Sequence, residues 1–404
     1  MKNKAISIVL IIGFLLAAGG VGAYVLWPEK EPEVVEEPES SVSEESSSEE
    51  SSSESSESEE PESSESSSEE SSSESSKDES SKKEEKKKLA KDEAYSQLTG
   101  LVVSKDVYKQ RPVAVSINNH VDACPQSNLN AADIVYEVMV EGSITRYVAV
   151  FQDYMDLEKI GSIRSARRYF LDFAMDQSAV LAHFGQDPDI VDTFYAIGCP
   201  HLNGLEDAYH YWRSTDRVAP HNVYTTGKDL ADAMDKYGYG ATMEEAIEDP
   251  MFKFYRVYED ASKMKKERKA LSKSDDTFSC KKLSIPGFNS SFTYNKDTKM
   301  YERTVYGEKQ IDAETKERTA CKNIILQFTD VYDRGDDKGH LDIDTIGEGD
   351  GYYICQNLVV PVHWVKEGQY ETTHYYLENG DQLVMVPGKT WICVLSNYQE
   401  YTIE

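Results

Sequence analysis

The sequence has few cysteines, and none of them lies near the N-terminus. The six cysteines of the 404 residues begin at Cys124, so the apolar N-terminal segment offers no thiol for a lipid anchor. No Cys-x-x-Cys pair occurs, and the wide spacing is not that of a structural zinc site. Exported proteins can form disulfides, so paired cysteines and free buried thiols both remain open.

Several motifs of well-defined chemistry are also missing. No G-x-S-x-G, P-loop or Rossmann fingerprint occurs, and the eight histidines show no H-E-x-x-H spacing. We therefore expect no metal and no cofactor. A basic face is missing as well, because the formal net charge is −30. Since nucleic-acid-binding proteins present such a face, we expect no nucleic-acid partner.

A long uncharged segment stands at the N-terminus. Residues 1–28 begin with two lysines, and the 23 residues from Ala5 to Trp27 carry no charge. This length suffices for a helix that spans a bilayer, and the preceding lysines put the N-terminus in the cytoplasm. The alternative is a cleaved signal peptide with Val21-Gly22-Ala23 as its cleavage site. In both cases the rest of the chain is exported. An uncleaved membrane helix predicts a single-pass cell-membrane protein with extracellular C-terminal domains.

Serine and glutamate dominate residues 29–95. Within 29–80 there are 21 acidic side chains and two lysines, a net charge of −19. A segment with so much charge and so few apolar residues cannot bury a core, so we predict a disordered linker. It would extend through the cell wall as a self-repelling tether. A phosphorylated or partner-binding acidic tail is the alternative.

The remaining residues suffice for two domains. Residues 96–245 predict an α/β (or α+β) domain. Residues 246–277, with the charged stretch KMKKERKAL, are expected to be a linker or a helix, and 278–404 a β-rich domain, either a small barrel or a sandwich. The elements predicted for the first domain are strands at 111–119 and 178–185, a hairpin over 132–153 that turns at Glu141-Gly142-Ser143, and helices at 163–176 and near 187–196, 204–212 and 228–237.

The stretch IGSIRSARRYF, residues 160–170, gathers three arginines in an acidic chain. If 163–176 is a helix with Ser162 as its N-cap, Arg167 falls at the edge of the buried stripe and Arg164 on a more exposed flank. A buried guanidinium needs a partner. That partner is either an internal carboxylate or the phosphate or carboxylate of a ligand.

Glu137 and Glu141 are internal candidates for this pairing. They also raise the question of a two-carboxylate hydrolase. In an extended strand they lie about 13 Å apart, whereas glycosidases need about 5 to 9.5 Å. The spacing therefore disfavours that chemistry.

Other polar residues are expected at strand ends and in loops. Asn118, Asn119 and His120 stand together at the end of a predicted strand, which favours a pocket lining over turn chemistry alone. His183 ends another strand and His221 lies in a loop, although structural histidines are the alternative for both. The candidate ligand-binding residues are Asn118, Asn119, His120, Glu137, Glu141, Arg146, Arg164, Arg167, His183, His221 and Asn222.

Two sets of motifs carry a family resemblance. The first is RPVAVSINNH, PQSNLNAADIVYEVMVEGSITRYVAVF, KIGSIRSARRYF and APHNVYT; the second is YERTVYG, the region around HWVKEG, and ENGDQLVMVPGKTWICV. Over nearly all of 97–396, the sequence resembles the YerB-like family of exported, membrane-anchored, lipoprotein-type proteins of Gram-positive bacteria. The resemblance implies paired N- and C-terminal domains of unknown function. Members usually carry a lipobox cysteine, which the long N-terminal segment replaces here.

Two hypotheses for the function follow. The first is a membrane-anchored extracytoplasmic envelope protein that binds a cell-wall polymer or a wall-synthesis protein through an arginine-containing anion site. The second is a hydrolase or transferase on an anionic envelope substrate, with Arg164 and Arg167 as clamps and His183 or His221 as acid and base. Convergence of these side chains on one open site would favour a ligand. Closed pairing of Arg167 with a glutamate would argue against it.

Overall fold

The structure, a computed structural model, describes residues 88–404. The predicted membrane segment 1–28 and most of the predicted linker 29–95 lie outside the described residues. The described residues 88–404 belong to one compact unit. Among residues 88–404, no helix is long and apolar enough to cross a membrane. Strands far outnumber helices in this part of the chain, and the β-rich character predicted for residues 278–404 is confirmed.

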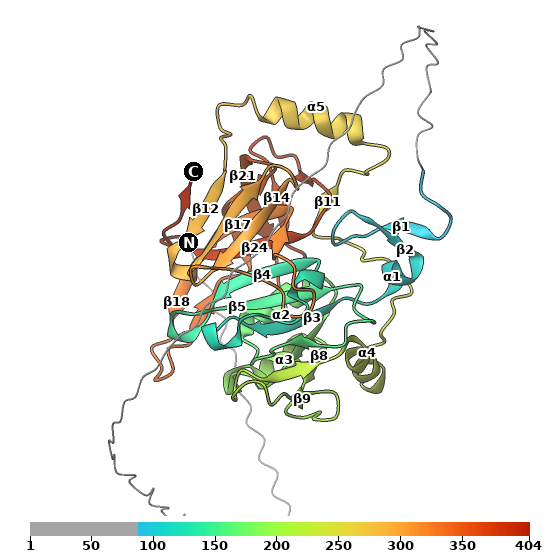
Figure 1. Cartoon of the computed structure of the whole chain (residues 1–404), viewed down its shortest axis with the longest axis vertical. Helices are drawn as coiled ribbons and strands as arrows, with labels where there is room; N and C mark the ends of the chain where they lie inside the picture. The colour runs from blue at the N-terminus through green and yellow to red at the C-terminus, as the bar shows by residue number, and fades with distance from the viewer. Residues whose placement is uncertain (1–87) are drawn as a thin grey trace, which may run out of the picture. The chain divides into compact units, whose positions relative to one another are not determined.

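A ten-stranded sheet runs through both halves of the described chain (Figure 1). In sheet order its strands are β22 (His374–Tyr376), β21 (Leu358–Lys366), β20 (Gly347–Cys355), β17 (Asn323–Thr329), β24 (Thr390–Ser396), β4 (Ile134–Met139), β5 (Thr145–Phe151), β3 (Val113–Asn118), β7 (Val180–His183) and β8 (His201–Asn203). β24 pairs in parallel with β17 on one side and with β4 on the other. The C-terminal strands therefore continue the N-terminal sheet.

The central strands are buried along nearly their whole length because both faces of the sheet are covered. All seven residues of β5, TRYVAVF, are buried. In β4, Tyr136 and Val138 point into one core and Val135 into the other. This alternation follows from the two-residue period of a strand.

One face of the sheet packs against helices α2 and α3, which contribute Phe170, Phe173 and Phe194 to its core. The other face packs against α4 and a second sheet, whose Leu283 and Phe292 meet Trp391 of β24. The helices are α1 (Lys105–Lys109), α2 (Arg168–Met175), α3 (Val191–Ile197), α4 (Gly227–Lys236) and α5 (Ala261–Leu271).

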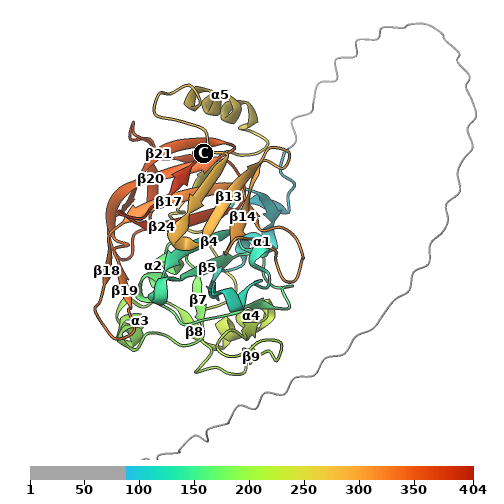
Figure 2. The same cartoon turned by 60° about the vertical axis from the view of Figure 1, so that its left-hand side comes forward.

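The second sheet belongs to the C-terminal half and lies beside the large sheet (Figure 2). Its strands are β15 (Glu308–Lys309), β14 (Met300–Val305), β13 (Ser290–Asn295), β12 (Lys282–Ile285) and β25 (Thr402–Ile403), with β16 (Ala320–Cys321) also paired to β14. The shorter pairings are β1 (Glu93–Tyr95) with β2 (Val102–Ser104), β6 (Ile160–Gly161) with β10 (Val223–Thr225) and β9 (Trp212–Arg213), β11 (Lys253–Phe254) with β23 (Val384–Met385), and β18 (Val331–Asp333) with β19 (Leu341–Ile343).

The predicted helix 163–176 is wrong in its first half. α2 begins only at Arg168, and its N-cap is Arg167 rather than Ser162. Residues 163–166 are extended because their backbone bonds to neighbouring segments: the Arg164 amide donates to the Ser116 carbonyl, and the Ala166 amide donates to Gly185. Tertiary hydrogen bonds thus override the apolar periodicity that suggested a helix.

Of the other predicted elements, some are confirmed and one is wrong. The hairpin around Glu141–Ser143, the strand at 111–119 and the helix near 228–237 are confirmed as β4–β5, β3 and α4. The predicted helix near 204–212 is wrong: the chain turns there and ends in β9, because the Asn203 side chain accepts from the Leu205 amide. Of the two alternatives for KMKKERKAL, the helix is correct, as α5.

All six cysteines lie within the described residues, and all are free thiols. Cys124 is half-buried and the other five are buried. Burial raises the pKa of Cys199, Cys280 and Cys321 well above the usual thiol range. Buried thiols of this kind are unreactive.

Candidate functional site

The end of β3, the extended segment before α2 and the loop 213–222 meet at one place in the fold. Asn118 Nδ2 lies 2.9 Å from His221 Nδ1. Arg164 donates from Nη1 to the Pro220 carbonyl at 3.3 Å. Three segments that are distant in sequence therefore bring Asn118, Arg164 and His221 together. Together with Arg213 and Arg217 of the same loop, these residues form what we call the Arg164 site.

Hydrogen bonds fix the tautomer of His221. The His120 amide donates to Asn118 Oδ1 at 3.0 Å, which turns the amide nitrogen of Asn118 towards His221. His221 Nδ1 must then accept, so its hydrogen sits on Nε2. His221 can thus donate a hydrogen bond from Nε2 to a bound group.

The three arginines of the site are held by neutral groups. Arg213 donates to Asn222 Oδ1 at 2.8 Å, and Arg217 donates to the carbonyls of Ala123 and Pro125 at 2.6 and 2.7 Å. The Nε atom of Arg164 is buried and has no hydrogen-bond partner among the described residues. Within residues 88–404, none of these three guanidinium groups forms an ion pair with a carboxylate.

The electrostatics of the site reflect this excess of positive charge. Burial lowers the pKa of His221, and its interactions with His120, Arg164 and Arg217 lower it further, with Asp122 acting in the opposite direction. Burial likewise lowers the pKa of Arg164, and Arg167 and Arg213 add to that effect against the opposing charge of Glu141. An anion bound between these groups would relieve their repulsion.

His120, Asp122 and His221 form a candidate metal cluster, since one ligand atom from each lies within 4.8 Å of the others. The hydrogen bonds oppose this use. His120 Nδ1 accepts from the Asp122 amide at 3.2 Å, as His221 Nδ1 accepts from Asn118. Both rings then carry hydrogen on Nε2 and lack the free lone pair that a metal requires. The donor set therefore fits an anion better than a cation.

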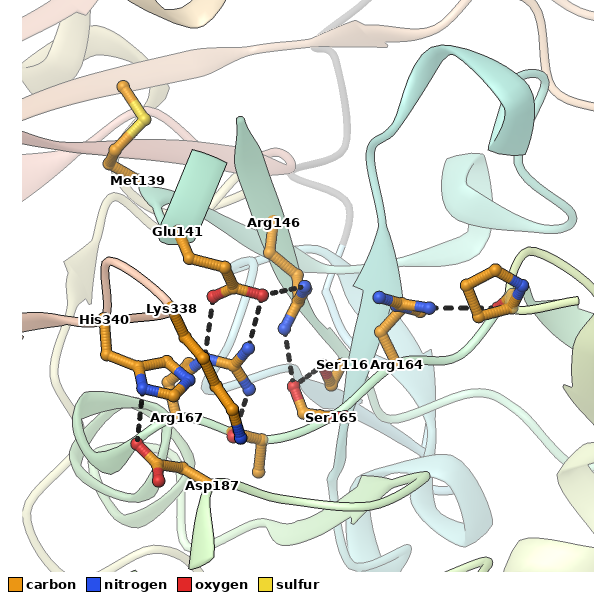
Figure 3. A network of polar contacts seen from close by, with 12 residues as sticks. Ser116, Met139, Glu141, Arg146, Arg164, Ser165, Arg167, Asp187, Lys338 and His340 are labelled. Carbon is orange, nitrogen blue, oxygen red and sulfur yellow. Dashed lines mark hydrogen bonds and ion pairs between the residues drawn. The ribbon is translucent and has the colours of Figure 1, made fainter. Parts of the chain in front are cut away.

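Glu141 holds Arg146 and Arg167 in a separate ion cluster (Figure 3). Arg167 Nε donates to Glu141 Oε2 at 2.9 Å and Nη2 to Oε1 at 2.5 Å. Arg146, fully buried, donates to Glu141 Oε1 at 3.3 Å and to the Ser165 carbonyl at 2.9 Å. Arg164 points away from this cluster (Figure 3).

This pairing decides the role of Arg167. Burial of Glu141 acts to raise its pKa, but Arg146 and Arg167 overcome that effect and lower the pKa to about 2. The expected burial of Arg167 is found, with a relative exposure of 6%. Its charge is satisfied inside the protein, so Arg167 is not free to clamp a ligand.

Glu137 belongs to a third group, which joins the two halves of the chain. Its carboxylate accepts from Arg303 Nη2 at 2.6 Å and from the Trp391 indole at 2.9 Å. It also accepts from Thr145, whose hydroxyl accepts from Asn119. Glu137 and Arg303 are both completely buried. Glu137, Glu141 and Asn119 therefore have structural partners, and the two glutamates do not form a catalytic pair.

His183 lies apart from these groups. It is fully buried, bonds to the Gly185 carbonyl and to His201, and stacks on Phe194 with ring centroids 5.3 Å apart. Burial lowers its pKa to about 3. His183 stays neutral inside the core and does not meet the Arg164 site.

The sequence-predicted candidates thus divide among four places. Asn118, His120, Arg164, His221 and Asn222 meet at or beside the Arg164 site. Sequence reasoning missed Arg213 and Arg217. The stretch WRSTDRVAPHN puts both arginines shortly before His221, and that spacing was the signal available. Arg303 gave no local signal, because its partner Glu137 is 166 residues away in sequence.

Models of two protein domains match this chain. The N-terminal domain of "Protein of unknown function (DUF3048)" matches residues 98–240, and the corresponding C-terminal domain matches residues 283–392. The Arg164 site lies within the first match. The second contains Arg303 and Trp391, the partners of Glu137.

Two further comparisons point to one relative. The chain is 30% identical to "Putative lipoprotein YerB" of Bacillus subtilis (strain 168) over 307 residues, which is 76% of this chain and 87% of that protein. The crystal structure of the YerB protein from Bacillus subtilis is similar, with a TM-score of 0.65 and 29% identity. That similarity covers 77% of this chain and 99% of the crystallised one.

Proposed function

This chain belongs to the YerB-like family, which pairs the N- and C-terminal DUF3048 domains, and from this premise we propose that it is a membrane-held extracytoplasmic protein that binds an anionic envelope polymer at the Arg164 site. The observation that carries the proposal is the grouping of Arg164, Arg213 and Arg217 around His221 without a carboxylate partner among the described residues. Such an arrangement is costly unless an anion completes it.

The chemistry of the site suits phosphate or carboxylate groups. A guanidinium group offers a planar fork of N–H donors that matches both anions. The Nε2 hydrogen of His221 adds a directed donor beside Arg164. A polymer that repeats the anion would gain from the local positive potential and would reach the site by electrostatic steering.

The extracytoplasmic location rests on two supports. The relative from Bacillus subtilis is named as a lipoprotein, which associates that protein with a membrane surface. In this chain, the uncharged residues 5–27 behind two lysines supply a membrane segment, and the acidic tract that follows supplies a tether. The two DUF3048 domains would then face the cell wall.

The binding test uses the full-length chain in detergent micelles with inorganic polyphosphate and polygalacturonate as probes. We expect Arg164→Ala and Arg213→Ala each to weaken binding of at least one probe about tenfold, because each removes a charge-assisted hydrogen bond. Dissociation constants from fluorescence titration would measure the effect. Arg256→Ala is the matched control, since Arg256 is exposed and lies outside the site.

Equal affinity of the wild type and Arg164→Ala, at unchanged melting temperature, would contradict the proposal. A hydrolase or transferase is the second candidate, favoured by the fixed tautomer of His221 beside Arg164. The same titration samples distinguish it: a catalyst shortens or modifies the polymer during incubation, and His221→Gln then retains binding but loses turnover. If the polymer is not modified, the enzyme candidate is excluded and binding remains as the function.

A further inference from the structure

A cavity of about 590 Å³ lies between α5 and the C-terminal strands. In both views α5 is at the outer end of the C-terminal half, near β21 (Figures 1 and 2). Its apolar lining comes from α5, from the turn after β22 and from β23: Ala270, Leu271, Leu377, Leu383 and Val384. This volume is in the usual range of small-molecule sites.

The cavity continues into a second one of about 200 Å³. Leu271, Ser274 and Leu377 line both, and the second extends to Val360 and Pro361 of β21. Because the two cavities share three lining residues, we treat them as one hollow, which we call the α5 groove. The apolar residues in its lining suit the hydrocarbon part of a ligand.

Helix α5, which covers the groove, makes few contacts with the rest of the protein. None of its 11 residues is buried, and only Met264 and Leu271 pack against the core. Two polar contacts fasten it, one from the Tyr255 hydroxyl to Glu267 and one from Arg268 to the Cys355 carbonyl. An isolated helix of this length is marginal in water, so a ligand under it would add the missing apolar contact.

The larger cavity has more basic than acidic residues in its lining. Lys253 of β11 and Lys263 of α5 line it, and neither forms an ion pair among residues 88–404. The two acidic residues that line the larger cavity are engaged: Glu267 accepts from Tyr255, and Asp381 accepts from the Asn379 amide. Asp276 and Glu378 line the smaller cavity instead. α5 itself carries five basic residues and one acidic residue, a net charge of +4 in an acidic chain.

We propose that the α5 groove binds a single-chain anionic lipid, with its acyl chain along Leu271, Leu377 and Leu383 and its acid group between Lys253 and Lys263. The apolar side chains contact the acyl chain, and the two lysines select an anionic over a neutral head group. This site is separate from the Arg164 site and does not depend on the function proposed for it.

The test uses the full-length chain in phosphatidylcholine nanodiscs and a photoactivatable palmitate. After illumination, labelled peptides are identified by mass spectrometry. We expect the label on peptides of α5 and of residues 377–384, and at least a fivefold loss of that label in Ala270→Trp, because the indole fills the groove. Ala270 is exposed, so this variant should keep its melting temperature.

Two comparisons make the result specific. Lys263→Glu should reduce labelling of the groove by palmitate, whereas Lys265→Glu, on the same helix but outside the lining, should not. The photoactivatable alcohol of the same chain length should label the groove less than palmitate does. Labelling that Ala270→Trp leaves unchanged, or equal labelling by acid and alcohol, would overturn the proposal. Absence of any label in the groove would also overturn the proposal and would point to a protein partner instead of a lipid.

Discussion

Arg164 and Arg167 lie three residues apart, yet they differ in burial and in partners. Arg167 is buried and forms two hydrogen bonds to Glu141, whereas Arg164 is half-buried and bonds only to a carbonyl. The difference arises because the chain is extended at Arg164 and turns into α2 at Arg167. In an extended segment, side chains three apart point to opposite sides.

The Glu141 cluster predicts a loss of stability in acid. The pKa of Glu141 is about 2 in the folded protein, below the usual value of 4.5. Protonation therefore favours the unfolded chain, and the contribution of Glu141, on the order of 2–3 kcal/mol, is present above about pH 4.5 and disappears as the pH falls towards 2. Thermal unfolding between pH 6 and pH 2 would measure it.

Glu141→Gln is the control for this acid effect. The amide keeps the shape but not the charge, so the variant should be less stable at pH 6 and should converge on the wild type near pH 2. A constant difference between the two proteins across that range would refute the assignment of the low pKa to Glu141.

At this scale the sequence predicted that Arg167 is partly buried and needs a partner, either an internal carboxylate such as Glu137 or Glu141 or a ligand anion. It could not predict which glutamate, because that depends on a bend at Gly142. Nor could it predict the pairing of Glu137 with Arg303, since that contact requires the two halves of the chain to meet.

Among the elements, α4 depends on one close approach of two backbone segments. Gly227 begins the helix, and its amide donates to the Leu157 carbonyl at 2.8 Å. A Cβ atom here would lie 1.6 Å from the Tyr154 carbonyl oxygen. The residue must therefore be glycine for α4 to bury Leu230 and Met234 against the sheet.

We expect Gly227→Ala to destabilise the protein by roughly 3 kcal/mol, because backbone must move to admit the methyl group. Gly142→Ala is the matched comparison. Gly142 has φ of 71° and nothing within 4 Å of an added Cβ, so only conformational strain of about 1 kcal/mol is expected. Urea denaturation would rank the two variants, and equal losses would contradict this steric account.

The elements that the sequence predicted well are those whose pattern is local. The β4–β5 hairpin has long β-rich runs around a glycine turn, and α4 has its capping threonine and apolar face. Residues 163–166 were mispredicted because their hydrogen-bond partners, Ser116 and Gly185, come from elsewhere in the chain. Hydrophobic periodicity indicates which side of a segment is buried, but it does not identify the hydrogen-bond partners of the backbone.

For the whole molecule, the main consequence of the shared sheet is cooperativity. β24 is hydrogen-bonded to both halves, and Glu137 and Arg303 add a buried ion pair across them. We predict one unfolding transition for residues 88–404 rather than two, with equal calorimetric and van't Hoff enthalpies. Two resolved transitions would show that the halves are independent.

Arg303→Ala tests the same cooperativity by removing one partner of the buried ion pair. Removing one partner of a buried pair leaves Glu137 uncompensated and should cost about 3–5 kcal/mol. The transition should move to lower temperature without splitting. Arg318→Ala is the control, because Arg318 pairs with Glu302 at a partly exposed position within the C-terminal half and should cost about 1 kcal/mol or less.

The position of β24 also bears on how the molecule is made. In chain order β24 follows every other strand of the ten-stranded sheet, yet in space it fills the gap between β17 and β4. Until that strand leaves the ribosome or the export channel, both neighbours keep an open edge, and open edges invite aggregation. Ribosomal stalling or proteolytic cleavage before Thr390 would therefore yield an aggregation-prone fragment rather than a smaller folded protein, and its exposed strand edges would make it a target for proteolysis.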